Sequence, residues 1–146
     1  MLAPNLTIAP ELLRDIPDCA KKFARGRVLV VDDERLLRWS ITETLTVRGY
    51  EVAEAGDGRA AMQEIGDGDR TDLVLLDLHL PDVDDLRLLA RMRQKAPNAP
   101  IILMTAFPTR EIVEDAQALG ASVLIKPFDL NALAADVEAA LTPRVY

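Results

Sequence analysis

The sequence predicts an α/β protein built on a doubly wound, five-stranded parallel sheet with strand order 2-1-3-4-5 and an N-terminal helical extension. From Arg27 onward, short apolar runs alternate with amphipathic segments, which is typical of a parallel sheet flanked by helices. Three of the runs are apolar throughout, as strands covered on both faces are. Five strand–helix units in about 120 residues are enough for one such sheet.

The strands follow from the apolar runs. The first, third and fourth are continuously apolar, the second is more polar and the fifth is shorter; they lie at Val28–Val31, Glu51–Glu54, Leu73–Leu76, Ile101–Met104 and Val123–Ile125. An amphipathic segment after each strand predicts a helix, at Arg35–Arg48, Arg59–Ile65, Leu86–Lys95, Arg110–Leu119 and Leu130–Leu141. Gly49 and Gly120 directly follow two of these helices, where a left-handed cap favours glycine.

Residues 1–26 are predicted to be a partly helical N-terminal extension. Apolar residues between Glu11 and Ala24 share one face, Pro10 suits a first helical position, and Pro17 should kink or split the helix. Two interpretations stay open: a peripheral appendage, or an arm that packs on the domain or on a partner. The main domain is expected to span residues 27–141, followed by a C-terminal tail at 142–146.

Composition limits the classes of function. The 146 residues suit one domain, and a formal charge of −7 argues against direct nucleic-acid binding, which needs clustered Lys and Arg. Cys19 is the single cysteine, so no intrachain disulfide framework is expected. No apolar run approaches the ~18 residues of a membrane span, and the N-terminus lacks the pattern of a signal peptide. We therefore expect a cytoplasmic protein that does not contact a membrane.

Polar residues follow four of the five predicted strands. Strand 1 ends in Asp32 and Asp33, strand 3 in Asp77, strand 4 in Thr105 and strand 5 in Lys126. In open α/β sheets, ligands bind beyond the carboxyl ends of the strands, so these side chains are expected to meet at one edge. Taken singly, Asp33 is explained as a helix cap, Thr105 as a turn residue and Lys126 as a solvated charge. Their convergence favours a functional site.

Three crowded carboxylates would repel one another, and a divalent cation removes that cost. Mg²⁺ prefers a few carboxylate oxygens together with water and substrate phosphate. A carboxylate can also act as a nucleophile toward phosphorus and give an aspartyl phosphate. The ammonium and hydroxyl groups would then share the charge of the transferred phosphoryl oxygens. The pattern therefore predicts phosphoryl transfer with Mg²⁺.

The motifs resemble a known family. The runs VLVVDDE at Val28–Glu34, LVLLDLHLP at Leu73–Pro81, MTA at Met104–Ala106 and KPF at Lys126–Phe128 resemble the receiver domain of two-component response regulators. The resemblance covers roughly Arg27 to Leu141. Two shorter runs, LLRWS at Leu36–Ser40 and TAF at Thr105–Phe107, are most similar to receivers of bacterial enhancer-binding activators of the nitrogen-regulatory type. The resemblance implies a flavodoxin-like fold.

The resemblance implies a role for each site residue. Asp77 would accept the phosphoryl group from a phosphohistidine of a sensor histidine kinase. Asp33 and Asp77 would bind Mg²⁺ directly, Asp32 through water, and the backbone carbonyl of His79 would complete the protein ligands. The His79 side chain is expected to line the rim of the site, where it influences water attack on the acyl phosphate.

Signal output is also implied by the resemblance. Thr105 and Lys126 would contact the phosphoryl group and report it to the helix 4–strand 5–helix 5 face, through which the family forms homodimers. An output domain or a downstream protein would receive the signal, and Leu36, Trp39 and Ser40 are candidates for kinase docking. The chain would be a signalling switch and not an enzyme, with only Mg²⁺-dependent self-phosphorylation and slow autodephosphorylation.

Two residues depart from the family pattern. Val123 occupies the position of the usual aromatic switch residue, and Asp85 stands where glycine is common. These departures motivate an alternative, a phosphorylation-independent adaptor. A Mg²⁺-dependent phosphohydrolase and a flavin-binding flavodoxin are weaker alternatives, because the acids after strand 1 suit neither an Asp-x-Asp nucleophile motif nor a phosphate loop. Whether the chain is free-standing or part of a longer regulator is left open by the sequence.

Overall fold

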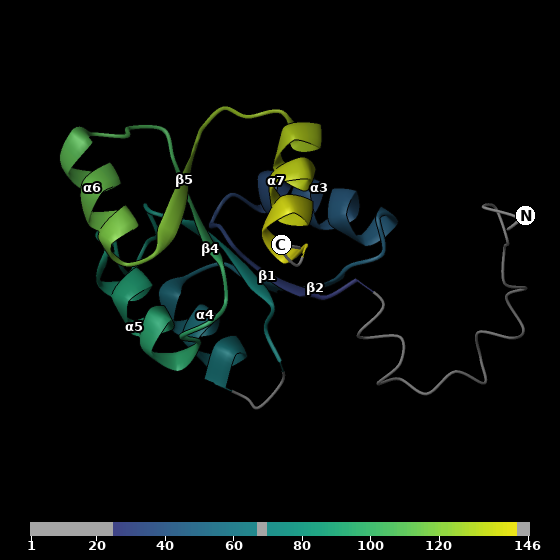
Figure 1. The fold of residues 1–146 in the computed structure, drawn as a ribbon, viewed down its shortest axis with the longest axis horizontal. Helices are drawn as coiled ribbons and strands as arrows, with labels where there is room; N and C mark the ends of the chain where they lie inside the picture. The colour runs from purple at the N-terminus through teal and green to yellow at the C-terminus, as the bar shows by residue number, and fades with distance from the viewer. Residues whose placement is uncertain (1–24, 67–69, 143–146) are drawn as a thin grey trace, which may run out of the picture.

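The computed structural model describes residues 25–66 and 70–142 (Figure 1). Within this part of the chain, strands and helices alternate. The strands are β1 (Arg27–Val31), β2 (Glu51–Ala55), β3 (Leu73–Asp77), β4 (Ile101–Thr105) and β5 (Ala121–Ile125). The helices are α3 (Arg35–Val47), α4 (Gly58–Gly66), α5 (Arg87–Lys95), α6 (Arg110–Ala118) and α7 (Leu130–Leu141). The predicted N-terminal extension lies outside the described residues except for Arg25 and Gly26.

The five strands form one parallel sheet in the order β2-β1-β3-β4-β5, which confirms the predicted fold. Chain order reverses direction across the sheet between β1 and β3, since β2 lies on one side of β1 and the later strands on the other. This is the switch point at which open α/β sheets place ligands, beyond the carboxyl ends of the strands.

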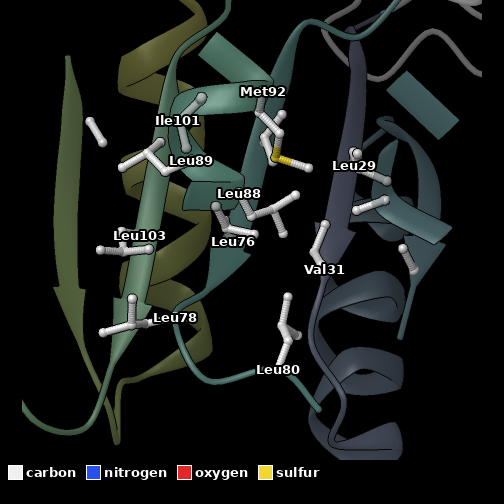
Figure 2. Packing of buried hydrophobic residues seen from close by; sticks show 14 of the residues in the cluster. Leu29, Val31, Leu76, Leu78, Leu80, Leu88, Leu89, Met92, Ile101 and Leu103 are labelled. Atoms are coloured by element: carbon white, nitrogen blue, oxygen red, sulfur yellow. The ribbon is translucent and has the colours of Figure 1, made fainter. Parts of the chain in front are cut away.

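Helices cover both faces of the sheet and bury two apolar clusters (Figure 1). Because side chains alternate along a strand, Leu29 and Val31 of β1 point into one cluster and Val28 and Val30 into the other. The first cluster packs against α4, α5 and α6, and the second against α3 and α7. Figure 2 shows the first cluster, in which side chains of α5 such as Met92 meet residues of β1, β3 and β4.

Most element boundaries agree with the sequence prediction to within a residue or two. The largest difference is β5, which begins at Ala121 and not at Val123 because Ala121 and Ser122 pair with Ile101 and Ile102 of β4. Gly49 and Gly120 have φ angles of 95° and 79°, so both adopt the left-handed conformation predicted for them. None of the helices in the described parts of the chain is long and apolar enough to cross a bilayer.

Candidate functional site

The register of the sheet brings the predicted site residues to one edge. Val31 of β1 pairs with Leu76 of β3, so Asp32 and Asp77 come next on two neighbouring strands. Asp77 in turn pairs with Met104, which places Thr105 one residue further along β4, and Thr105 pairs with Ile125 just before Lys126. Four strand ends therefore meet at the switch point, as the sequence analysis predicts.

Lys126 lies among three carboxylates. Its Nζ is 2.9 Å from Asp32 Oδ2, 3.4 Å from Asp77 Oδ1 and 3.6 Å from Glu34 Oε1. The side chain is only 13% exposed, so it is not a solvated surface charge. Burial disfavours the ammonium, but the hydrogen bond to Asp32 and the charges of Asp32, Asp77 and Glu34 outweigh burial and raise the pKa of Lys126. The lysine therefore stays protonated beside Asp77.

Asp77 is 5% exposed and is held in a crowded environment. Burial and the nearby charge of Asp32 raise the pKa of Asp77 to about 6, although Lys126 and the His79 backbone N–H oppose this change. The N–H of His79 donates to Asp77 Oδ1 over 3.4 Å. Without a further cation, the fold thus places a carboxylate where its charge is only partly compensated.

The acids form a group that suits a divalent cation. One carboxylate oxygen from each of Asp32, Asp33 and Asp77 lies within 4.8 Å of the other two. Asp32 and Asp77 are buried, whereas Asp33 is exposed and open to water. Hard oxygen donors with access to solvent fit Mg²⁺, which keeps several of its waters when protein carboxylates bind it. Burial and the charge of Asp32 raise the pKa of Asp77 despite Lys126, so a bound cation would stabilise its charged form.

Arg38 supports the acidic loop, and the sequence analysis missed it. Its Nη1 donates to the backbone carbonyl of Asp32 over 2.6 Å, and its Nε donates to Glu54 on β2 over 3.0 Å. The Oδ1 atom of Asp32 also accepts the backbone N–H of Glu34 over 2.9 Å. An arginine on the first turns of a helix gives no sequence signal for such a role, because its partner is a carbonyl.

Thr105 is fully buried, and the sheet places it at the predicted edge. Its Oγ1 accepts the backbone N–H of Phe107 over 3.1 Å, and its backbone carbonyl accepts the N–H of Lys126 over 2.8 Å. The hydroxyl thus orders the loop after β4, and within the described residues it forms no hydrogen bond to Asp77. The backbone of Thr105 is nevertheless linked directly to Lys126.

The rim of the site carries exposed aromatic and apolar groups. The rings of His79 and Phe107 meet edge to face at a centroid distance of 6.4 Å, and Phe107 is 72% exposed. A cavity of about 380 Å³ lies beside Lys126, lined by Glu34, Leu37, Ala106, Pro127 and Phe128 as well. On the nearby helix α3, Leu36 and Trp39 are 75% and 57% exposed. Ser40 is half-buried.

The two departures from the family pattern have defined surroundings. Val123 of β5 is half-buried and packs against the cluster beneath α4, α5 and α6. Asp85 is exposed and accepts hydrogen bonds from the backbone and side chain of Arg87, which lower its pKa. Asp85 is therefore engaged at the start of α5.

Comparisons with known proteins show what the chain is similar to. The model of the response regulator receiver domain matches residues 28–138. The transcriptional regulatory protein PdtaR of Mycobacterium tuberculosis is 39% identical over 118 residues, 80% of this chain and 57% of that protein. The transcriptional regulator NtrC of Azospirillum brasilense is 36% identical over 120 residues, 82% of this chain and 25% of that protein. The chain thus spans little more than half of the first relative and a quarter of the second.

Among solved structures, the chemotaxis protein CheY4 of Vibrio cholerae has a TM-score of 0.74 and 30% sequence identity to this chain. The similarity covers 81% of this chain and 100% of that chain. The fold and the order of its elements are therefore those of a known group of structures.

Proposed function

The chain belongs to the response regulator receiver domain family, and we propose that it accepts a phosphoryl group from a sensor histidine kinase on Asp77. The observation that carries the proposal is the contact of Lys126 with both Asp32 and Asp77 at the switch point of the sheet. A buried nucleophile beside a fixed ammonium and two further acids is suited to phosphoryl transfer.

The transfer step assigns a role to each group. A carboxylate oxygen of Asp77 forms a bond to phosphorus while the bond between phosphorus and the kinase histidine nitrogen breaks. The electron pair of that bond returns to the imidazole, which remains on the kinase. Lys126 stabilises the equatorial phosphoryl oxygens by its charge. Thr105 donates its hydroxyl proton to one of them, since the Phe107 N–H uses Oγ1 only as an acceptor.

Mg²⁺ is the cofactor in this proposal. Asp33 and Asp77 would bind it directly, Asp32 through water, and the backbone carbonyl of His79 would complete the protein ligands. When bound, Mg²⁺ supplies charge that neutralises the phosphoryl oxygens and the crowded acids. The three clustered carboxylates support this assignment.

The phosphorylation signal would leave the site through α6, β5 and α7, which form the helix 4–strand 5–helix 5 face of the sequence analysis. Thr105 and Lys126 are linked through their backbones, and Lys126 directly follows β5, so a change at either residue would be transmitted to this strand. Homodimerisation through the α6–β5–α7 face belongs to the same proposal. Val123 lacks an aromatic ring, so Phe107, which bonds Thr105 through its backbone, is the better candidate for the moving aromatic group.

The partners follow from the same assignment. The exposed Leu36 and Trp39, with Ser40, form a surface on α3 suited to kinase docking. An output domain or a separate downstream protein would receive the signal. A cytoplasmic location belongs to the proposal.

Beryllofluoride with Mg²⁺ tests the proposal, because it mimics a phosphoryl group on a carboxylate. We expect amide chemical shifts to change around Asp77 and across α6, β5 and α7 in NMR spectra of the isotope-labelled chain. Neither reagent alone should produce the full change, and the Asp77→Asn protein should not respond. Spectra of the wild type without site-specific changes around Asp77 would contradict the assignment.

A phosphorylation-independent adaptor is the second candidate, and the half-buried Val123 at the switch position favours it. Binding to the native partner and cellular output separate the two functions. An Asp77→Ala chain that binds and signals as the wild type does would support the adaptor and exclude the phosphoacceptor role.

A further inference from the structure

A groove of about 570 Å³ lies between α4 and α5. The two helices are neighbours on one face of the sheet (Figure 1). The groove is lined on α4 by Arg59 and Met62, on the loop before α5 by Asp82 and Val83, and on α5 by Leu88, Arg91 and Lys95, among others. Asp32, Asp33, Asp77, Thr105 and Lys126 do not line it.

The rim of this groove is positively charged. Arg87, Arg91 and Lys95 recur every four residues, so they form one stripe along α5, and Arg59 stands opposite on α4. Arg87 is paired with Asp85 over 2.9 Å. Among residues 25–66 and 70–142, the side chains of Arg59, Arg91 and Lys95 form no hydrogen bond or ion pair. The acid that lines the groove, Asp82, accepts the backbone N–H groups of Gly58 and Arg59.

This arrangement is unfavourable for the isolated chain. Like charges four residues apart on a helix repel one another, and no carboxylate of the described residues forms an ion pair with Arg91 or Lys95. The chain has 24 acidic and 17 basic residues, so unpaired cations do not reflect a shortage of acids. An anionic ligand in the groove would remove the repulsion.

The apolar floor of the groove restricts which class of anionic ligand can fit. Leu88 is 4% exposed, and Met62 and Val83 are partly buried against the same apolar cluster. Such a floor accommodates an aliphatic side chain, whereas a nucleic-acid backbone would leave it uncovered. We propose that the α4–α5 groove binds an acidic peptide segment of a partner protein, with carboxylates on the cationic rim and an aliphatic side chain on Met62 and Val83.

Fluorescence anisotropy tests this proposal on the full chain. The probe is a short fluorescein-labelled peptide of alternating glutamate and leucine residues, compared with a peptide that has glutamine in place of glutamate. Binding of the acidic probe should weaken with increasing salt, since exposed charges are screened. The glutamine peptide should bind at least about fivefold more weakly.

Two charge-matched double variants locate the binding. Arg91→Ala with Lys95→Ala removes two cations of the groove, and Arg48→Ala with Arg110→Ala removes two exposed arginines elsewhere. We expect the first pair to weaken binding about fivefold or more and the second pair to leave it within about twofold. Met62→Ser should weaken binding of the acidic probe, because it removes an apolar contact for the leucine side chains. Circular dichroism and thermal unfolding verify that each variant is folded.

Four outcomes overturn the proposal. The acidic probe fails to bind at low salt, or both double variants bind it equally. A labelled oligonucleotide binds the groove as tightly as the peptide does, which assigns the cations to a phosphate backbone. Sedimentation shows a concentration-dependent dimer that only the groove variant loses, which makes a second copy the occupant. None of these results bears on phosphorylation of Asp77, because the groove and the acidic site share no lining residue.

Discussion

At the scale of single residues, the carboxylate of Asp77 lies in an environment that differs strongly from water. It is buried, faces Asp32, and is only partly compensated by Lys126, so its pKa rises to about 6. A raised pKa of an acid means that the folded state binds a proton more tightly than the unfolded state does. The site therefore lowers stability at neutral pH, and a cation or a phosphoryl group with its metal would restore it.

Asp77→Asn should stabilise the metal-free protein at pH 7. Below the unfolded value of 3.8, Asp77 is protonated in both states and has no effect. As pH rises through about 6, the folded state also loses the proton at a cost, so the wild type loses stability. We expect the variant to gain on the order of 1 to 3 kcal/mol in the free energy of unfolding. Urea unfolding with a chelator at pH 5 and pH 7 measures it.

Mg²⁺ and a second variant provide the controls for this prediction. Saturating Mg²⁺ should stabilise the wild type, by about 2.7 kcal/mol at a hundredfold excess over Kd, and the Asn variant less. Asp33→Asn removes an exposed carboxylate and should change the metal-free stability by less than about 0.5 kcal/mol. A metal-free Asp77→Asn protein that is less stable than the wild type at pH 7 would show that attraction to Lys126 outweighs burial.

Arg38 is predicted to be a positioning residue for the acids after β1. Because it holds the Asp32 carbonyl over 2.6 Å and is paired with Glu54, its loss should misplace the acidic loop more than it changes the charge. We expect Arg38→Ala to weaken Mg²⁺ binding about tenfold, in the range known for groups that orient metal ligands. Isothermal titration calorimetry measures the affinity, with Glu54→Gln as the variant that keeps the bond to Asp32.

The opposite result for Arg38 has a clear meaning. If Arg38→Ala binds Mg²⁺ as tightly as the wild type or more tightly, repulsion between the guanidinium and the metal outweighs positioning.

The sequence predicted which side chains meet, since strand ends in a parallel sheet meet at one edge. It did not predict Arg38, or that the Thr105 hydroxyl bonds the Phe107 backbone, because such contacts depend on loop geometry.

At the scale of secondary-structure elements, the loop after β3 is attached to the start of α4. Asp82 accepts the backbone N–H groups of Gly58 over 2.8 Å and Arg59 over 3.0 Å. These bonds lower the pKa of Asp82, led by the bond from Gly58. A Cβ atom at Gly58 would lie 3.0 Å from Val83 and 3.2 Å from Asp82, so glycine allows this close approach. Asp82 thus caps a helix that is distant in the sequence.

Asp82→Ala should lower the free energy of unfolding by about 1 kcal/mol, because two N–H groups at the start of α4 lose their acceptor. The loss should shrink at low pH, where the carboxyl of Asp82 is protonated and accepts more weakly. Asp84→Ala, which removes a neighbouring exposed acid, is the matched control and should have little effect. Equal destabilisation by both changes would assign the effect to the charge of the loop and not to the cap.

The elements themselves were predictable because their apolar periodicity reflects burial. The continuous run at Leu73–Leu76 is buried on both faces of the sheet, and the stripe of Ile41 and Leu45 faces the core. The start of β5 was predicted two residues late, since Ala121 and Ser122 carry no strong strand signal and extend the strand only by pairing with β4. Asp82 gave a loop signal, but its bond across 24 positions was not visible in the sequence.

At the scale of the whole molecule, the sheet connects the acidic edge to the surface around β5. Asp77 ends β3, and β4 lies between β3 and β5. Thr105 is the last residue of β4 and Lys126 directly follows β5, and the two strands pair along five residues. β5 is an edge strand of the described sheet, so it is not held by hydrogen bonds to a second neighbouring strand. Ile125, directly before Lys126, is 55% exposed on this strand.

Ile125→Glu is predicted to weaken homodimerisation of the beryllofluoride-activated protein through α6, β5 and α7. An exposed apolar side chain next to Lys126 is suited to the centre of an interface. A carboxylate at the same position would have to lose its water on dimerisation, at a cost in free energy. We expect the association constant of the dimer to fall about tenfold or more, which corresponds to a loss of about 1.4 kcal/mol in the free energy of association. Sedimentation velocity over a concentration series, with Mg²⁺ and beryllofluoride, measures it.

The control for this prediction is a variant of an exposed apolar residue on a different helix. Val47 is 82% exposed on α3, outside this face, so Val47→Glu introduces the same charge and should leave the activated dimer unchanged. Both variants should keep the Mg²⁺-dependent spectral response around Asp77, since neither residue lines the acidic site. An activated dimer that survives Ile125→Glu but not Val47→Glu would move the interface to α3, and the edge strand would then carry the signal to a different partner.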